Sequence, residues 1–185
     1  MSASQPSLSQ NLDTFLQQFV QHSQNKTGSL PLVEADEQWP SPCEVGEPSA
    51  NGMVQWQPAK FDSALSFDNV EKALELRLHD DIKTYFCHCF AESVPATAKD
   101  GNLELLFAWS ADDFERLQKN VIGHVLMKQK LKQQVTVFFA VTDEEDINLV
   151  INNDSGEVWT EAVGCEPSHK VSDSLAEFIA QLSPL

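Results

Sequence analysis

Apolar residues near the start of the chain follow the spacing of a helix. Between residues 8 and 20 they recur every three or four positions, which places them on one helical face. Ser7 or Ser9 can cap the first turn, and Gly28 belongs to the residue type that most often ends helices. We therefore predict an N-terminal helix within residues 1–28.

The next segment, residues 30–52, is interrupted repeatedly by proline and glycine. Its four prolines and two glycines exclude long helices and strands. We therefore predict an irregular loop, which the aromatic side chain of Trp39 can pin. Residues 53–57 (MVQWQ) alternate in character and stop at Pro58, which predicts a short strand.

A second helical pattern begins near Asp68. Glu71 follows three residues later, which resembles a capping box, and the apolar positions that come next continue one helical face. The pattern leaves open whether this helix continues through Phe86 or breaks near residues 79–81.

A strand and a third helix are predicted next. Residues 102–109 have the composition of a strand, and Ser110 with Asp113 marks the start of a helix with a regular apolar face. Gly123 lies inside this helix, where a glycine costs about 1 kcal/mol relative to alanine. We therefore expect Gly123 to mark either a break in the helix or a close contact.

The C-terminal part of the chain has the pattern of strands followed by a helix. Residues 135–141 (VTVFFAV) are typical of a buried central strand. The segments 147–152 and 157–163 flank Asn-Asp-Ser-Gly at 153–156, whose residue types favour a tight turn between antiparallel strands. After this predicted hairpin, Ser172 can cap a closing helix.

Taken in order, these elements predict an α+β fold. A helix, a strand, a helix, a strand, a helix, three strands and a helix fit a mixed or antiparallel sheet with helices packed on it. A chain of 185 residues can bury a substantial core, and its 42% share of hydrophobic residues is ordinary for a globular protein. We therefore expect a single compact domain over residues 1–185.

The charge balance narrows the range of partners. Twelve Lys and Arg residues against 28 Asp and Glu residues leave a formal net charge of −16. Such a charge repels nucleic acid and anionic lipid headgroups and attracts basic surfaces. Acidity also keeps many proteins in solution, and composition alone favours this simpler explanation. We expect neither a nucleic-acid partner nor direct lipid binding, and the sequence leaves the oligomeric state open.

Nothing in the sequence marks the chain for export or for a membrane. No apolar run approaches the about 20 residues of a transmembrane helix, and the N-terminal residues have neither the basic region nor the apolar core of an export signal. We therefore expect a cytosolic protein whose four cysteines are reduced thiols.

Few residues are candidates for a metal-binding or catalytic site. Cys87-His88-Cys89 is the one cluster that resembles a metal site, and no second cluster at zinc-type spacing accompanies it. The sequence contains neither a Gly-x-Ser-x-Gly elbow nor a Walker-type phosphate loop. His124 is the one histidine that we consider as a general base, although a histidine beside an apolar stripe is more often structural. We therefore expect no metal, no cofactor and no catalytic site, and we keep an enzyme that uses His124 as a third hypothesis.

Several short blocks stand out along the sequence. They are Trp-Pro-Ser-Pro-Cys (39–43), Trp-Gln-Pro (56–58), Trp-Ser-Ala-Asp-Asp-Phe (109–114), Ile-Gly-His (122–124), Gln-Lys-Leu-Lys (129–132), Asn-Asp-Ser-Gly-Glu-Val (153–158) and Leu-Ala-Glu-Phe (175–178). Taken in this order, the blocks resemble those of the Syd family, and the resemblance covers nearly the whole chain after the first predicted helix. Trp39 and Gln55 depart from the family pattern, because tyrosine is usual at these positions.

The resemblance implies a fold, a partner and a location. The fold is that of the SUKH superfamily, and the partner is SecY, whose cytosolic loops meet a concave acidic surface at the cytoplasmic face of the inner membrane. Surveillance of translocon assembly is the implied role. The alternative within the same superfamily is a toxin-neutralising immunity protein.

The implied SecY contact agrees with the charge of the chain, because cytoplasmic loops of membrane proteins carry an excess of Lys and Arg. Acidic residues close to predicted helix starts and in the predicted loop are the candidates for this contact. They are Asp36, Glu37, Asp80, Asp81, Asp112, Asp113 and Glu115.

Overall fold

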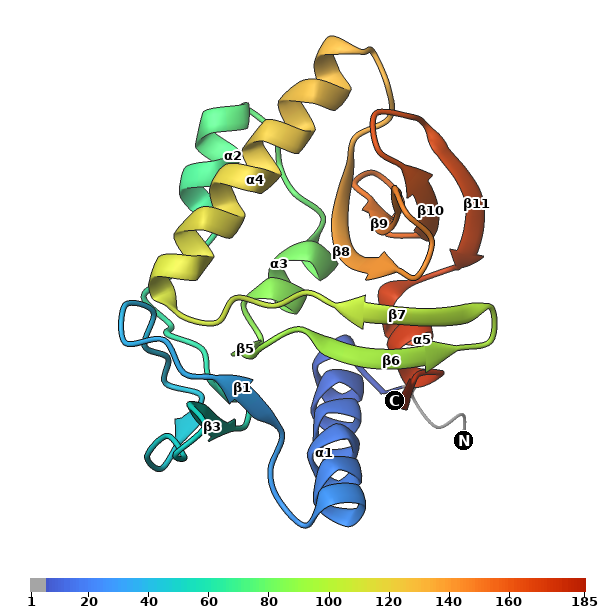
Figure 1. Ribbon diagram of the computed structural model, residues 1–185. Helices are drawn as coiled ribbons and strands as arrows, with labels where there is room; N and C mark the ends of the chain where they lie inside the picture. Colours follow the sequence, from blue (N-terminus) through green and yellow to red (C-terminus); the bar gives the residue numbers. More distant parts are fainter. Residues whose placement is uncertain (1–5) are drawn as a thin grey trace.

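A seven-stranded antiparallel sheet forms the centre of the computed structural model, which describes residues 6–185 (Figure 1). Its strand order is β11-β10-β9-β8-β7-β6-β12. The strands are β6 (Val94–Ala98), β7 (Gly101–Leu105), β8 (Thr136–Thr142), β9 (Ile147–Asn152), β10 (Val158–Ala162), β11 (Pro167–Ser172) and β12 (Ser183–Pro184). The first five residues of the segment predicted as an N-terminal helix lie outside the described part of the chain.

Among residues 6–185, two small sheets flank the central one. β1 (Leu32–Glu34), β3 (Met53–Trp56) and β2 (Glu44–Val45) form a three-stranded antiparallel sheet, and β4 (Ala59–Lys60) pairs with β5 (Cys89–Phe90). The segment predicted as an irregular loop therefore also contains two short strands. They remain three and two residues long because prolines and glycines bound them.

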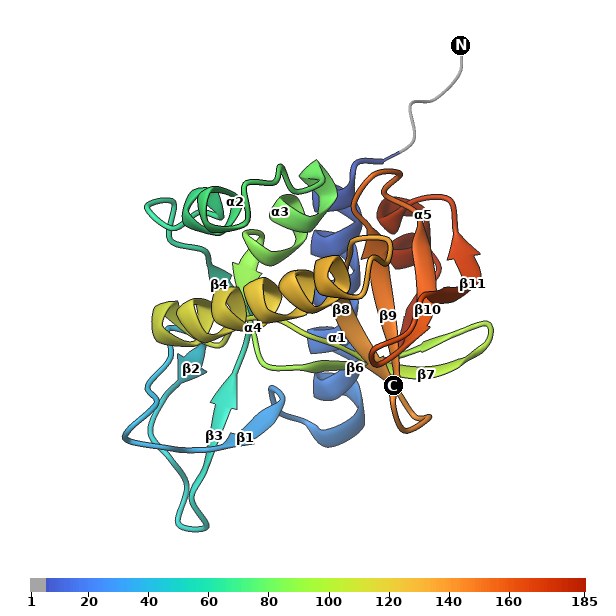
Figure 2. The ribbon, with the colours of Figure 1, turned by 90° about the horizontal axis from the view of Figure 1, so that it is seen from above.

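In the described part of the chain, five helices pack around the sheets. They are α1 (Leu8–Thr27), α2 (Asp68–Leu74), α3 (Asp80–Phe86), α4 (Ala111–Lys130) and α5 (Leu175–Ala180). α1 packs against α5, β12 and α3, whereas α4 packs against α2 and β8. Figure 2 shows α4 crossing the molecule in front of α1 and leading into β8. A single α+β domain with helices on an antiparallel sheet, as the sequence predicts, is thus confirmed.

The helix ends confirm three sequence predictions. The Ser7 side chain accepts a hydrogen bond from the Gln10 N–H, and Gly28 ends α1 in the left-handed region with φ 77°. Ser110 caps α4 by accepting from the Asp113 N–H.

α4 runs unbroken through Gly123, where in the described structure an added Cβ would meet no atom within 4 Å. Gly123 thus marks neither a break nor a close contact.

Other local predictions are wrong. The pattern near Asp68 gives no capping box, because the N-cap is Phe67 and Glu71 instead accepts from the Leu78 N–H. The sequence left open whether this helix continues, and the structure answers the question: α2 ends at Leu74, its C-cap Glu75 has a left-handed φ of 49°, and α3 is a separate helix. Ser174 caps α5 in place of Ser172, because the chain is still in β11 at Ser172. The predicted strand 102–109 ends at Leu105 as β7.

The core lies between the central sheet and the helices. Tyr85 and Phe86 of α3 are fully buried, and the Tyr85 ring stacks on Phe107 and meets Phe139 of β8 edge-on. Phe114 links α4 to the same core through an edge-on contact with Phe67. Burying an aromatic side chain of this kind stabilises the fold by about 1.5–3 kcal/mol, so α3 and α4 are held firmly in place.

Candidate protein-binding surfaces

The N-terminal end of α4 carries three of the predicted acidic residues. Asp113 has structural contacts, because its Oδ2 accepts the Trp109 N–H at 2.9 Å and its Oδ1 lies 3.6 Å from Arg116. Glu115 pairs with Lys119 at 2.7 Å, and this hydrogen bond lowers the pKa of Glu115. Asp112 is exposed, and within residues 6–185 its side chain has no hydrogen bond or ion pair.

The loop after β1 brings two more predicted acidic residues to the same region. Asp36 folds this loop, because its Oδ1 accepts the Gln38 N–H and its carbonyl accepts the Trp39 N–H. The loop is fastened to α4 by the Trp109 Nε1–H, which donates to the Trp39 carbonyl at 3.2 Å. Figure 1 shows this blue loop beside the start of α4. The structure thus gathers five of the seven predicted residues there: Asp36, Glu37, Asp112, Asp113 and Glu115.

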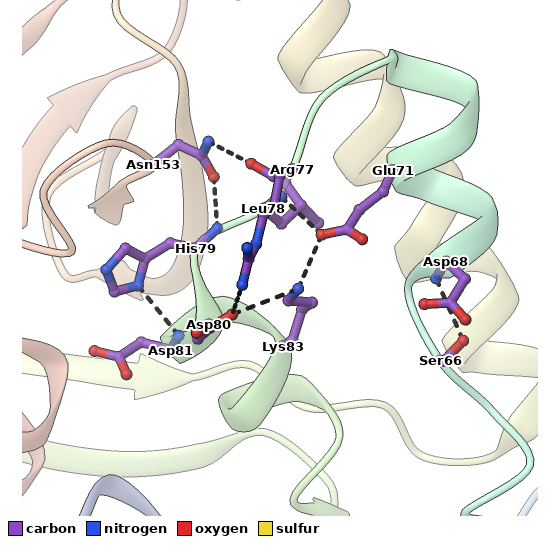
Figure 3. A network of polar contacts seen from close by, with 10 residues as sticks. All are labelled: Ser66, Asp68, Glu71, Arg77, Leu78, His79, Asp80, Asp81, Lys83 and Asn153. Carbon is purple, nitrogen blue, oxygen red and sulfur yellow. Dashed lines mark hydrogen bonds and ion pairs between the residues drawn. The ribbon is translucent and has the colours of Figure 1, made fainter.

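The other two predicted residues, Asp80 and Asp81, lie at the start of α3 in a separate polar network (Figure 3). Asp80 Oδ1 lies 3.3 Å from Arg77 and 3.6 Å from Lys83, and its hydrogen bond to Arg77 is the main cause of its lowered pKa. The Asp81 N–H donates to the ring of His79 at 3.1 Å. Asp80 is therefore partly neutralised by its neighbours.

A hollow that the sequence did not predict lies at the end of the central sheet where the β6–β7 hairpin turns. It has a volume of about 310 Å³ and opens between the β6–β7 hairpin, the β8–β9 turn and β11. Three exposed acidic residues line it together with buried or half-buried apolar side chains: Asp100, Asp143 and Glu144 with Leu103, Leu149, Val171 and Phe178. Its lining, taken from the described residues, includes none of the seven predicted positions.

The sequence contained part of the signal for this hollow. The run Asp143-Glu144-Glu145-Asp146 is visible as an acidic cluster, but Asp100 lies more than forty residues earlier. The pairing of β7 with β8 brings the two segments together, because Leu103 stands opposite Thr142. Only the sheet register therefore identifies this concave acidic surface.

A larger hollow of about 580 Å³ lies between α1 and β4 and has a different character. Amide side chains such as Gln17 and Gln57 dominate its polar lining. Its charged groups are Lys60 and Asp13, and Asp13 pairs with His88 at 2.8 Å. This hollow therefore lacks the excess of carboxylates found at the β6–β7 hairpin.

His124 belongs to a buried polar cluster between α4 and β10. The Lys128 Nζ lies 2.9 Å from Glu161, and Thr136 donates to the same carboxylate at 2.8 Å. His124 lies 3.3 Å from the Thr136 hydroxyl, and burial, with the charge of Lys128 as a second cause, lowers its pKa to about 4. His124 lines neither of the two hollows, so the hypothesis of a general base at this position has no structural support.

The cysteine cluster does not form a ligand set. Cys87 ends α3, whereas Cys89 is buried in β5. Burial raises the pKa of Cys87 to about 11 and that of Cys89 to about 12, so both thiols are protonated at neutral pH. In the described part of the chain, no group of three or more His, Cys, Asp or Glu side chains is placed to hold a metal ion.

Among residues 6–185, no helix combines the length and the apolar character that crossing a bilayer requires.

Fold and surface together define a class of protein: a single-domain α+β protein with strongly acidic surface regions, one of them concave. Comparison with known sequences identifies the family. The family model described as "Syd protein (SUKH-2)" matches residues 9–184, and the chain belongs to the Syd family.

Individual relatives match this chain over most of their length. "Protein Syd" of Colwellia psychrerythraea is 52% identical over 99% of this chain and 96% of the relative. "Protein Syd" of Alteromonas mediterranea is 45% identical over 96% of this chain and 97% of the relative. "Protein Syd" of Shewanella frigidimarina is 42% identical over 97% of this chain and 83% of the relative. The resemblance found in the sequence blocks is thus confirmed.

Proposed function

We propose that this protein is a binding module that docks on the basic cytosolic loops of the SecY channel. The observation that carries the proposal is the hollow at the β6–β7 hairpin, where Asp100, Asp143 and Glu144 surround an apolar lining. Such a surface suits a turn of polypeptide that presents Lys or Arg beside an apolar side chain. SecY is the partner because the family resemblance implies it.

The charge of the whole molecule supports the same partner. A net charge of −16 steers basic surfaces toward the protein and accelerates their encounter, most strongly at low salt. Anionic lipid headgroups repel the same charge, so attachment to the membrane runs through a protein receptor. We infer a peripheral location on the cytoplasmic face of the inner membrane and a role in surveillance of translocon assembly.

Three acidic regions compete for the principal contact: the hollow, the start of α4 with the loop after β1, and the start of α3. The hollow is concave, and within residues 6–185 its carboxylates form no ion pair, whereas several acids at α4 and α3 are neutralised by Arg or Lys neighbours. We therefore assign the principal contact to the hollow. The seven residues first selected from the sequence remain candidates for additional contacts.

Co-sedimentation with inverted membrane vesicles tests the proposal. We expect binding to vesicles enriched in SecY at low salt, weaker binding at high salt, and background binding to vesicles depleted of SecY. Equal binding to both kinds of vesicle would overturn the assignment of SecY and would favour the alternative of a toxin-neutralising protein.

Charge-reversal variants then locate the contact. The triple variant Asp100→Lys, Asp143→Lys and Glu144→Lys should lose most of the SecY-dependent binding. The matched control is Glu47→Lys, Glu75→Lys and Asp154→Lys, because these exposed residues do not line the hollow and change the net charge equally. Equal losses in both triple variants would show that net charge, and not the hollow, determines binding.

A further inference from the structure

Trp39 is an exposed aromatic residue fixed on a rigid support. Its side chain is 39% exposed, which is unusual for the largest apolar residue type. Its N–H donates to the Asp36 carbonyl at 3.0 Å, and its own carbonyl accepts from the Trp109 Nε1–H. The main chain at Trp39 is therefore anchored to the N-terminal end of α4, and the indole ring is presented from a fixed point.

A cation already occupies one face of this ring. The Arg116 guanidinium lies 5.1 Å from the ring centroid of Trp39, which is within the range of a cation–π contact. Arg116 is held loosely, because its side chain is 62% exposed and its nearest carboxylate, Asp113, is 3.6 Å away. That distance is longer than a hydrogen bond. Arg116 can therefore leave the ring without losing a buried contact.

The charges around the ring favour a cation over any other occupant. Asp36 and Glu37 precede Trp39 in its own loop, and Asp112 and Asp113 lie at the start of the helix that carries Arg116. Lys119, the next basic residue on that helix, is paired with Glu115 instead. The surroundings of Trp39 thus hold more negative than positive charge.

The geometry points to the Trp39 ring as the binding site for one Arg or Lys side chain from a basic turn of a partner protein. In the free protein, Arg116 of the same chain occupies this cation-binding site. The carrying observation is the exposed ring with a displaceable guanidinium on it. Trp is the aromatic residue with the strongest cation–π attraction, and tryptophan is enriched among residues that dominate binding at protein interfaces. The identity of the partner rests on the proposed function.

The test removes the Arg116 side chain from the Trp39 ring and compares this variant with a charge-matched control. Arg116→Ala and Lys119→Ala each delete one exposed positive charge that lies beside a carboxylate on the same face of α4. Only Arg116→Ala also frees the Trp39 ring. The probe is a fluorescein-labelled Gly-Arg-Gly-Arg-Gly peptide, whose dissociation constant is measured by anisotropy at low ionic strength.

We expect both variants to bind the peptide more tightly than the unaltered protein, with Arg116→Ala tighter than Lys119→Ala by roughly two- to fivefold. Trp39→Phe should weaken binding, and in a Trp39→Leu background the advantage of Arg116→Ala should disappear. The thermal midpoint of each variant shows that the fold is retained. Equal effects of Arg116→Ala and Lys119→Ala would overturn the inference.

The peptide assay separates this inference from the proposed function. It contains no SecY, so failure of the vesicle experiment leaves its result unchanged. If peptide binding depends on Trp39 but sedimentation does not depend on SecY, the cation-binding site at Trp39 is supported and SecY is rejected as its partner. If sedimentation depends on SecY but is unaffected by Trp39→Leu and by Arg116→Ala, SecY is supported as the partner and the cation-binding site at Trp39 is rejected.

Discussion

The side-chain amide of Asn153 holds the main chain at His79: its Oδ1 accepts the His79 N–H at 2.9 Å (Figure 3). Its Nδ2 donates to the carbonyl of Arg77, also at 2.9 Å. One side chain from the β9–β10 turn therefore fixes the chain on both sides of Leu78, which is buried in the core. This contact places the start of α3, and with it Asp80 and Asp81, against the turn.

Asn153→Ala should lower the free energy of unfolding by about 1–3 kcal/mol, because it removes two hydrogen bonds, to the His79 N–H and to the Arg77 carbonyl, each worth about 0.5–1.5 kcal/mol. Urea denaturation measures the loss. The neighbouring substitution Asp154→Ala removes an exposed side chain and should change the stability by less than about 0.5 kcal/mol. A loss of similar size in both variants would show that the amide clamp contributes little.

Gly156→Ala should destabilise the protein more than Gly164→Ala. Both glycines have a left-handed φ, 75° and 79°, so both substitutions incur the same backbone strain of about 1–2 kcal/mol. A Cβ at Gly156 would also fall 2.5 Å from Cε1 of His79, whereas at Gly164 it would meet no atom within 4 Å in the described structure. We expect the overlap to add about 1–3 kcal/mol in chemical denaturation. Equal losses would contradict a tight contact between Gly156 and His79.

His124 should make the stability depend on pH between neutrality and about pH 4. Its folded-state pKa of about 4 lies below the ordinary value of 6.5, so the unfolded state binds a proton more readily. The contribution of His124 is therefore complete above about pH 6.5 and is lost as the pH falls toward 4.

The measurement compares urea unfolding at pH 7 and pH 5. The unaltered protein should lose ~1–2 kcal/mol more stability between these values than His124→Gln does. NMR of the imidazole should show a neutral ring at pH 5.5. A protonated His124 at that pH would contradict the burial argument.

Asp112→Lys and Asp113→Lys should differ in stability although the residues are adjacent. Both place a positive charge at the start of α4, which costs about 0.3–1 kcal/mol through the helix dipole. Asp113→Lys also removes the acceptor of the Trp109 N–H and should cost about 1 kcal/mol more. The thermal midpoint should therefore fall by a few degrees further for Asp113→Lys. Equal midpoints would show that the Trp109 contact is dispensable.

The sequence alone was sufficient to predict the helices, strands and turns whose pattern is local. α1, α4 and β8 combine a regular apolar period with a recognisable cap or a β-branched run, so neighbouring residues already specify each element. The Asn-Asp-Ser-Gly turn between β9 and β10 was predictable for the same reason. The ordered blocks also identified the family, because their order and composition do not depend on the fold.

Elements stabilised by distant partners were not predictable. β6 contains Pro95 and small residues, and β11 is a polar edge strand, so neither has the apolar alternation of a strand. Each becomes a strand because a neighbouring strand supplies its hydrogen bonds. The separation of α2 from α3 likewise depends on Asn153, which is more than seventy residues away.

The acidic residues could be listed from the sequence, but their grouping is a property of the tertiary structure. The loop of Asp36 reaches α4 through the contacts of Trp39 and Ser41 with Trp109, and Asp100 meets Asp143 because β7 pairs with β8. A carboxylate binds a basic partner according to the field of all charges near it, and that field depends on distances between residues far apart in the chain. The sequence therefore determined the charge and the family of this protein, and the packing of strands and loops decided where that charge is concentrated.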